Sequence, residues 1–140
     1  MSSDNTILIL ASKNEYRLVH VQAADDLYFT WTGDPNTSEP VCARVFEFFS
    51  SCNPLKEKDK VLLEAQRLYE ELDYVEYGIQ SVATDKTFKE IVEQAIKDYD
   101  NEISSVRQMT HNLSFEHRKD IVNELKNYKK EAQKWLSLHL

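Results

Sequence analysis

Glycine is scarce in this chain of 140 residues, which holds only Gly33 and Gly78. Phosphate-binding loops need several glycines, because the backbone must approach the phosphate closely and adopt positive φ angles. Neither a GxGxxG pattern nor a GxxxxGK(S/T) pattern occurs in the sequence. The scarcity of glycine therefore argues against the common phosphate-loop routes to nucleotide binding.

Cysteine is also rare, with only Cys42 and Cys52 present. Small secreted proteins that depend on disulfides carry several cysteine pairs in a shorter chain. The two cysteines are ten positions apart, so they form no CxxC motif for metal binding. We expect two partly buried thiols, and a disulfide or redox pair is the alternative.

Long apolar runs are absent: the longest, residues 7–11, has five residues, against the roughly 20 that a membrane-spanning helix needs. The N-terminal residues 1–5 are polar and lack the basic start of a signal peptide. These features predict a protein without a membrane span that is located in the cytoplasm, and a nuclear location stays open.

Charge is distributed unevenly along the chain. Residues 1–83 hold 7 Lys/Arg and 14 Asp/Glu, and residues 84–140 hold 10 of each, so the net charge of −7 lies in the first part. An acidic surface repels the phosphate backbone of nucleic acids. Broad electrostatic binding of nucleic acid through residues 1–83 is therefore not expected.

The sequence predicts an α+β fold with two parts, an α/β segment over residues 1–83 and a helical hairpin over residues 84–140. The first part is expected to form a small antiparallel or mixed sheet of four or five strands with one packed helix. An apolar stripe of Val61, Ala65, Leu68 and Leu72 at helical spacing predicts that helix over residues 56–72. Alternating or continuous apolar residues predict strands over residues 6–11, 16–24, 27–32, 41–50 and 74–83.

Two details of this first part depend on side-chain spacing. In the strand over 16–24, we expect the face of Arg17, Val19 and Val21 to point into the core, with Arg17 at its solvent end. Residues 41–49 are ambiguous, because their valines and aromatic residues favour a strand while part of their spacing fits a helix. We favour the strand.

The second part is predicted to be two antiparallel helices, over residues 87–109 and 114–138. Thr87 and Glu90 have the spacing of a capping box, and Ser114 can cap the second helix. Residues 88–107 carry a net charge of −2 and residues 115–139 a net charge of +2, which favours their pairing. The short connection between them predicts an antiparallel arrangement.

No pattern of catalytic or metal-binding residues is found, so the sequence predicts a protein that is not an enzyme and has no cofactor. The four histidines, His20, His111, His117 and His139, are scattered and form no metal motif. Paired carboxylates such as Asp25 and Asp26 fall at predicted turns, where acids are commonly solvated. A small enzyme built around Trp31, His20 and the loop 32–40 is the third functional possibility.

The leading hypothesis is a non-catalytic module for protein–protein interaction or assembly that uses the hairpin. Two helices alone cannot cover two apolar stripes, so the remainder must pack on the first part, on a second copy of the chain or on another protein. The residues expected to contact the partner are Tyr99, Ile103, Tyr128, Ala132 and Trp135.

The alternative hypothesis is a nucleic-acid-associated regulatory protein. Its phosphate contacts would come from a stripe on the last helix, expected opposite the apolar stripe, that consists of Lys119, Lys126, Lys130 and Lys134. The stripe also resembles an ordinary solvated helix face. The sequence therefore argues against nucleic acid as a partner but does not exclude it.

Overall fold

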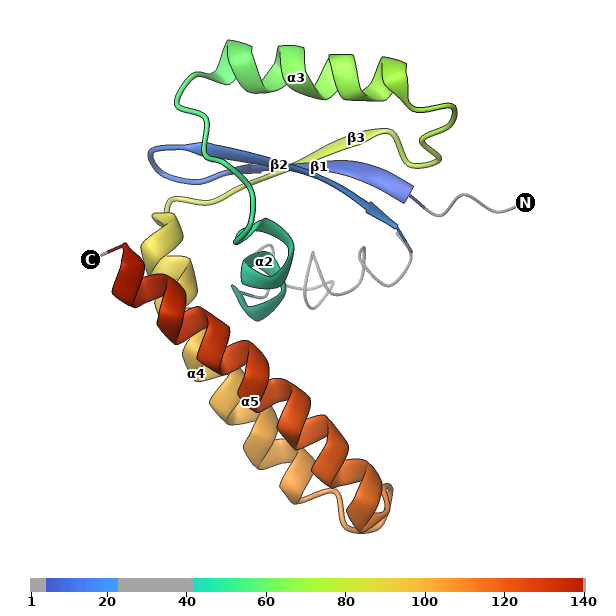
Figure 1. Cartoon of the computed structure of the whole chain (residues 1–140), viewed down its shortest axis with the longest axis vertical. Helices are drawn as coiled ribbons and strands as arrows, with labels where there is room; N and C mark the ends of the chain where they lie inside the picture. The colour runs from blue at the N-terminus through green and yellow to red at the C-terminus, as the bar shows by residue number, and fades with distance from the viewer. Residues whose placement is uncertain (1–4, 23–41, 140) are drawn as a thin grey trace.

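The computed structural model describes residues 5–22 and 42–139 (Figure 1). Within these residues the strands are β1 (Asn5–Ala11), β2 (Tyr16–Gln22) and β3 (Ile79–Ala83). The helices are α2 (Cys42–Phe49), α3 (Lys58–Glu71), α4 (Phe88–Arg107) and α5 (Phe115–Leu138). The α+β class and a packed pair of C-terminal helices are confirmed.

The described strands form one mixed sheet in the order β2-β1-β3. β1 pairs antiparallel with β2 and parallel with β3. The described sheet therefore has three strands, fewer than the predicted four or five. The predicted strand over 27–32 and the last two residues of the one over 16–24 lie outside the described residues. Figure 1 shows α3 on one face of the sheet, and α2 with the hairpin of α4 and α5 on the other.

β1 is the central strand, paired with β2 on one edge and β3 on the other, and both of its faces are covered. Ile7 and Ile9 pack with Val61 and Ala65 of α3. Leu8 and Leu10 belong to the larger cluster, which includes residues of α2, α4 and α5. This larger core contains residues from both sides of residue 84, so the sheet and the hairpin share it.

Arg17 differs from its predicted position at the solvent end of β2, since only 4% of it is exposed. Its Nη1 donates hydrogen bonds to the carbonyl oxygens of Phe49 (3.0 Å) and Cys52 (2.8 Å). Its Nε and Nη2 contact the carboxylate of Glu15 at 3.4 and 3.3 Å. A buried arginine is stable here because its donors meet carbonyl oxygens at and after the end of α2 and the carboxylate of Glu15.

The predicted strand over residues 41–50 is wrong, because the structure has the helix α2 there. Its buried side chains, which face α4 and the sheet, are those of Cys42, Ala43, Val45, Phe46 and Phe49. Arg44 lies on the exposed side. The polar face of this eight-residue helix consists only of Arg44 and Glu47, so its mostly apolar sequence resembles that of a buried strand.

The predicted strand over residues 74–83 is too long, because β3 begins only at Ile79. The side chain of Asn5 binds the preceding segment: its Nδ2 donates to the carbonyl of Tyr74 (3.0 Å), and its Oδ1 accepts from the amide of Glu76 (2.9 Å). Gly78 then turns the chain with a φ of 66°. Backbone groups that bind a side chain are not available to a strand ladder.

The hairpin begins with the predicted capping box, in which the Thr87 hydroxyl accepts from the amide of Glu90 and the Glu90 carboxylate accepts from the amide of Thr87. α4 and α5 pack along each other, and the ion pair between Lys129 and Asp100 (2.8 Å) links them. The end of the hairpin that contains the turn extends away from the sheet and from α2 (Figure 1). In the described part of the chain, every helix is too short or too polar to cross a membrane.

Candidate functional site

Three of the five residues that the sequence hypothesis assigns to a partner are buried within this chain. Tyr99, Ile103 and Ala132 are 1%, 7% and 0% exposed. The hydroxyl of Tyr99 donates to the carbonyl of Ala43 on α2 (3.2 Å), and its ring stacks on that of Tyr128 with centroids 6.0 Å apart. These contacts join α2, α4 and α5.

Trp135, the fifth of these residues, is partly buried near the end of α5, where the guanidinium carbon of Arg17 on β2 lies 6.0 Å from its ring centroid. Its ring meets the Phe88 ring edge to face at 5.2 Å and stacks on the His139 ring at 3.9 Å. The predicted set therefore lies along the inner side of the hairpin, where it contacts the chain's own core.

The four lysines of the alternative hypothesis are all exposed along α5. They divide into two pairs, because Lys119 and Lys126 line a groove near the hairpin turn while Lys130 and Lys134 lie beyond it. The structure therefore separates lysines that the sequence places in one stripe.

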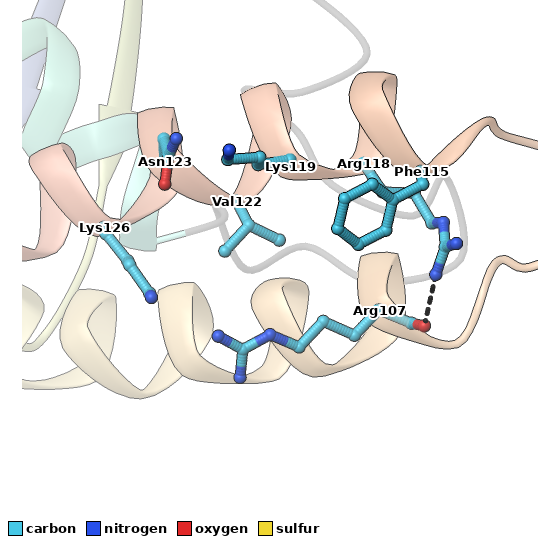
Figure 2. Close-up of a pocket in the computed structure, with 7 residues that line it drawn as sticks. All are labelled: Arg107, Phe115, Arg118, Lys119, Val122, Asn123 and Lys126. Carbon is cyan, nitrogen blue, oxygen red and sulfur yellow. Dashed lines mark hydrogen bonds between the residues drawn. The ribbon is translucent and has the colours of Figure 1, made fainter.

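We call this hollow the distal groove; it has a volume of about 320 Å³. Figure 2 shows its lining, which comes from the last residue of α4 and the first three turns of α5: Arg107, Phe115, Arg118, Lys119, Val122, Asn123 and Lys126. The side chain of Val122 is buried and forms an apolar surface between the two helices, whereas Phe115 is 68% exposed.

Local hydrogen bonds hold the distal groove at the turn between the helices. Ser114 caps α5 by accepting a hydrogen bond from the amide of His117 (3.1 Å). Nη1 of Arg118 donates to the carbonyl of Arg107 (3.2 Å), as Figure 2 shows. This contact satisfies a carbonyl that the end of α4 leaves open. Figure 2 shows the Arg118 guanidinium at the end of the groove nearest the turn, whereas the Arg107 side chain extends along α4 toward Lys126.

The distal groove is cationic. Four of its seven lining residues carry positive charge, and no lining residue is acidic. Within the described part of the chain, the side chains of Arg107, Lys119 and Lys126 form no ion pair. Nε of Arg118 is buried without a hydrogen-bond partner. The groove therefore offers several unpaired donors beside an apolar surface, a combination suited to an anionic group attached to an apolar one.

Sequence reasoning missed the groove because it placed the lysines opposite the apolar stripe. Phe115, Lys119, Val122 and Lys126 are spaced by four, three and four residues, so they lie on one face of α5. That spacing could have indicated a surface on which cationic and apolar side chains alternate. The contribution of Arg107 depends on the pairing of the two helices, which no spacing within α5 reveals.

A second pocket, of about 410 Å³, lies where the hairpin meets the sheet. Its lining includes Glu15, Arg17, Cys52, Trp135 and His139. Burial raises the pKa of the Cys52 thiol, although the nearby Arg17 charge opposes the shift. A thiol with a raised pKa is protonated at neutral pH and is a poor nucleophile, and the polar groups of Arg17 are already paired within the chain.

A third pocket, of about 310 Å³, lies between α2 and the hairpin and contains Glu47, Glu102 and Glu124. Burial raises the pKa of Glu47, Arg44 lowers it, and the charges of Glu102 and Glu124 raise it further. Burial also raises the pKa of Glu102. Glu47 belongs to α2 and faces this pocket between α2 and the hairpin, so its ionisation affects how firmly α2 docks there.

The other candidate residues from the sequence are not brought together. His111, His117 and His139 are exposed. No group of three metal-ligating side chains occurs in residues 5–22 and 42–139. Cys42 and Cys52 do not form a disulfide. The pair Asp25 and Asp26, Trp31 and the loop 32–40 lie outside the described residues.

Comparison of the chain with known protein families, with curated proteins and with solved structures found no significant match. The function is therefore inferred from the geometry of the distal groove and from the arrangement of the hairpin.

Proposed function

We propose that the protein is a non-catalytic module for protein–protein interaction, with the hairpin as its contact arm. The observation that carries the proposal is the exposure of apolar side chains where the hairpin extends beyond α2 and the sheet (Figure 1). Phe115 is 68% exposed and Met109 is 40% exposed at this end of the molecule. Phe115 lines the distal groove and Met109 lines the third pocket, so each exposed apolar side chain stands beside a hollow. Exposed apolar surface beside a groove with polar surroundings is typical of interaction sites.

The position of the hairpin supports the same function. Its end nearest the sheet is held by Phe88, Trp135 and the buried residues of α2, so the arm has a firm base. Its other end contributes only Ile103 and Val122 as buried residues beyond the level of Tyr99 and Leu125. A rigid arm with an accessible end can dock a partner without rearrangement of the core.

The test is a selection from a displayed library of random peptides against the full chain and against the variant Phe115→Ser. Because Phe115 is exposed, the variant should keep the circular dichroism spectrum and melting temperature of the wild type. Peptides enriched on the wild type should be lost on Phe115→Ser and retained on the control Leu63→Ser, which replaces a 72% exposed residue of α3. Equal enrichment on all three proteins would count against the proposal.

The second candidate function is regulation through contact with nucleic acid, which the exposure of all four stripe lysines on α5 favours. Phosphate contacts release counterions, so binding of this kind weakens steeply as salt concentration rises. Titration of a labelled single-stranded RNA at low and moderate salt tests it. A steep salt dependence that Lys130→Glu and Lys134→Glu reduce would favour this function over the first.

A further inference from the structure

We infer that the distal groove docks an acidic segment of another protein, one that carries carboxylates on both sides of a leucine or phenylalanine side chain. The inference rests on the proposed function and names its partner's chemistry. It depends on the charge of the groove lining, on the apolar surface between the cations and on the size of the hollow.

Charge complementarity determines the sign of the occupant. Arg107, Arg118, Lys119 and Lys126 all line the groove, and no lining residue carries a negative charge. Arginine binds carboxylates through paired hydrogen bonds, and the lysines add compact charges that attract them over a longer range. An acidic segment is therefore attracted to this surface, whereas a basic one is repelled.

The apolar part of the lining determines the rest of the chemistry. Val122 lies between the cationic side chains, and the exposed Phe115 ring stands at the end of the groove nearest the turn (Figure 2). An occupant made only of carboxylates would leave the Phe115 ring, which is 68% exposed, in contact with water or cover it with charge. A segment with an apolar side chain between its acids covers the Phe115 ring and the small part of Val122 that is still accessible, while its carboxylates meet the cations.

The dimensions favour a peptide over a nucleic acid. A hollow of about 320 Å³ accommodates one or two side chains of a peptide. A single-stranded nucleic acid would instead follow the exposed lysines along α5, including Lys130 and Lys134 outside the groove. The net charge of the whole chain is −7, which repels a long polyphosphate partner. A short acidic segment contacts only the cationic end of the hairpin, so this repulsion affects it less.

The test uses the full chain and two charge-reversal variants of α5. The double variant Lys119→Glu/Lys126→Glu alters the groove, and the matched control Lys130→Glu/Lys134→Glu makes the same change in charge two turns further along the helix. All four lysines are exposed, so circular dichroism should show both variants folded. The probe is a library of random peptides displayed on phage, and the binding of synthetic copies of the enriched peptides is then measured by fluorescence anisotropy.

We expect the wild type and the control variant to enrich peptides with acidic residues around leucine or phenylalanine. Lys119→Glu/Lys126→Glu should bind these peptides at least about tenfold more weakly, since two attractive charges become repulsive. Replacing the apolar residue of the peptide by serine should weaken binding to the wild type by a similar factor.

Several results would overturn the inference. If the enriched peptides are neutral or basic but still require Phe115 for binding, the proposed interaction function would stand and the inference of an acidic partner would be wrong. Acidic peptides that both double variants bind as the wild type does would place the binding outside the distal groove and overturn the inference. A selection that enriches no peptide on the wild type would count against the inference and against the proposed function together. A single-stranded RNA that binds more tightly than any peptide and is weakened equally by both variants would identify nucleic acid as the occupant. A dimer by light scattering that only Lys119→Glu/Lys126→Glu dissociates would identify a second copy of this chain.

Discussion

The guanidinium carbon of Arg17 lies 3.9 Å from the centroid of the Phe88 ring, so a residue of β2 packs directly on the first residue of α4. The same guanidinium donates to the carbonyls of Phe49 and Cys52 at the end of α2. One buried side chain thus joins the sheet, α2 and the base of the hairpin. The orientation of the hairpin relative to the sheet depends on this contact.

Replacement of Arg17 by methionine should destabilise the protein by about 3 kcal/mol, because the Cys52 carbonyl and the Glu15 carboxylate would lose the donors of Arg17 and the Phe49 carbonyl would keep only the amide of Cys52. Urea unfolding followed by circular dichroism measures the loss. The matched variant Arg67→Met removes an arginine that pairs with Glu64 and Glu71 on the exposed surface of α3. Exposed ion pairs contribute little, so an equally large loss in Arg67→Met would contradict the role assigned to Arg17.

Trp135→Glu should destabilise the folded monomer by about 3 kcal/mol, because it puts a carboxylate against the Phe88 ring. The molar mass measured by light scattering should be the same for this variant and for the wild type. A wild-type dimer that becomes a stably folded monomer in Trp135→Glu would instead place Trp135 in an interface between copies of the chain.

Stability should depend on the ionisation of Glu47, whose pKa is raised by burial and by the nearby Glu102 and Glu124, against the opposing charge of Arg44. A carboxyl with a raised folded-state pKa binds its proton more tightly in the folded protein than in the unfolded one. The folded state is therefore favoured below the ordinary value of 4.5, and this advantage is lost as the pH rises through the raised pKa.

Glu47→Gln should consequently raise the melting temperature at neutral pH, and the difference from the wild type should disappear as the pH falls below 4.5. Thermal melts across a pH series measure the effect. The control Glu93→Gln changes an exposed glutamate of α4 and should show no comparable gain at neutral pH. A Glu47→Gln variant that is less stable at pH 7 would mean that the Glu47 charge stabilises α2.

Gly78→Ala should cost about 1 kcal/mol, because the φ of 66° at this position lies in the left-handed region. A Cβ placed there would meet no atom within 4 Å, so the cost comes from the backbone alone. Gly78→Asn should lose less stability, since asparagine tolerates this conformation better. Equal losses for alanine and asparagine in chemical denaturation would indicate a cause other than the backbone angle.

The misassigned residues share a physical cause. α2 was predicted to be a strand because it is short, apolar on most of its surface and rich in aromatic residues. Local sequence does not distinguish a buried helix of this kind from a buried strand, and the contacts with α4 and the sheet decide between them. Likewise, Arg17 was expected at the surface, since its buried acceptors, the carbonyls of Phe49 and Cys52, come from a distant segment.

The candidate site shows the same division. The exposure of Lys119, Lys126, Lys130 and Lys134 on α5 could be predicted from their spacing, and all four are exposed. The sequence could not predict that Lys119 and Lys126 line the groove while Lys130 and Lys134 lie outside it, because Arg107 of α4 completes the groove. Of the five residues expected to meet a partner, Tyr99, Ala132, Tyr128 and Trp135 lie in or against the core cluster that α2 shares with the hairpin, and Ile103 is 7% exposed.

By itself, the sequence determined the α+β class, the capping box at Thr87 and the packed pair of C-terminal helices. Each of these follows from the period of the apolar residues or from hydrogen bonds between residues close in sequence. Only the tertiary structure decided the helical state of α2, the burial of Arg17 and the assembly of four cations in the distal groove. These features depend on contacts between residues far apart in the chain, which become neighbours only when the sheet and the hairpin pack together.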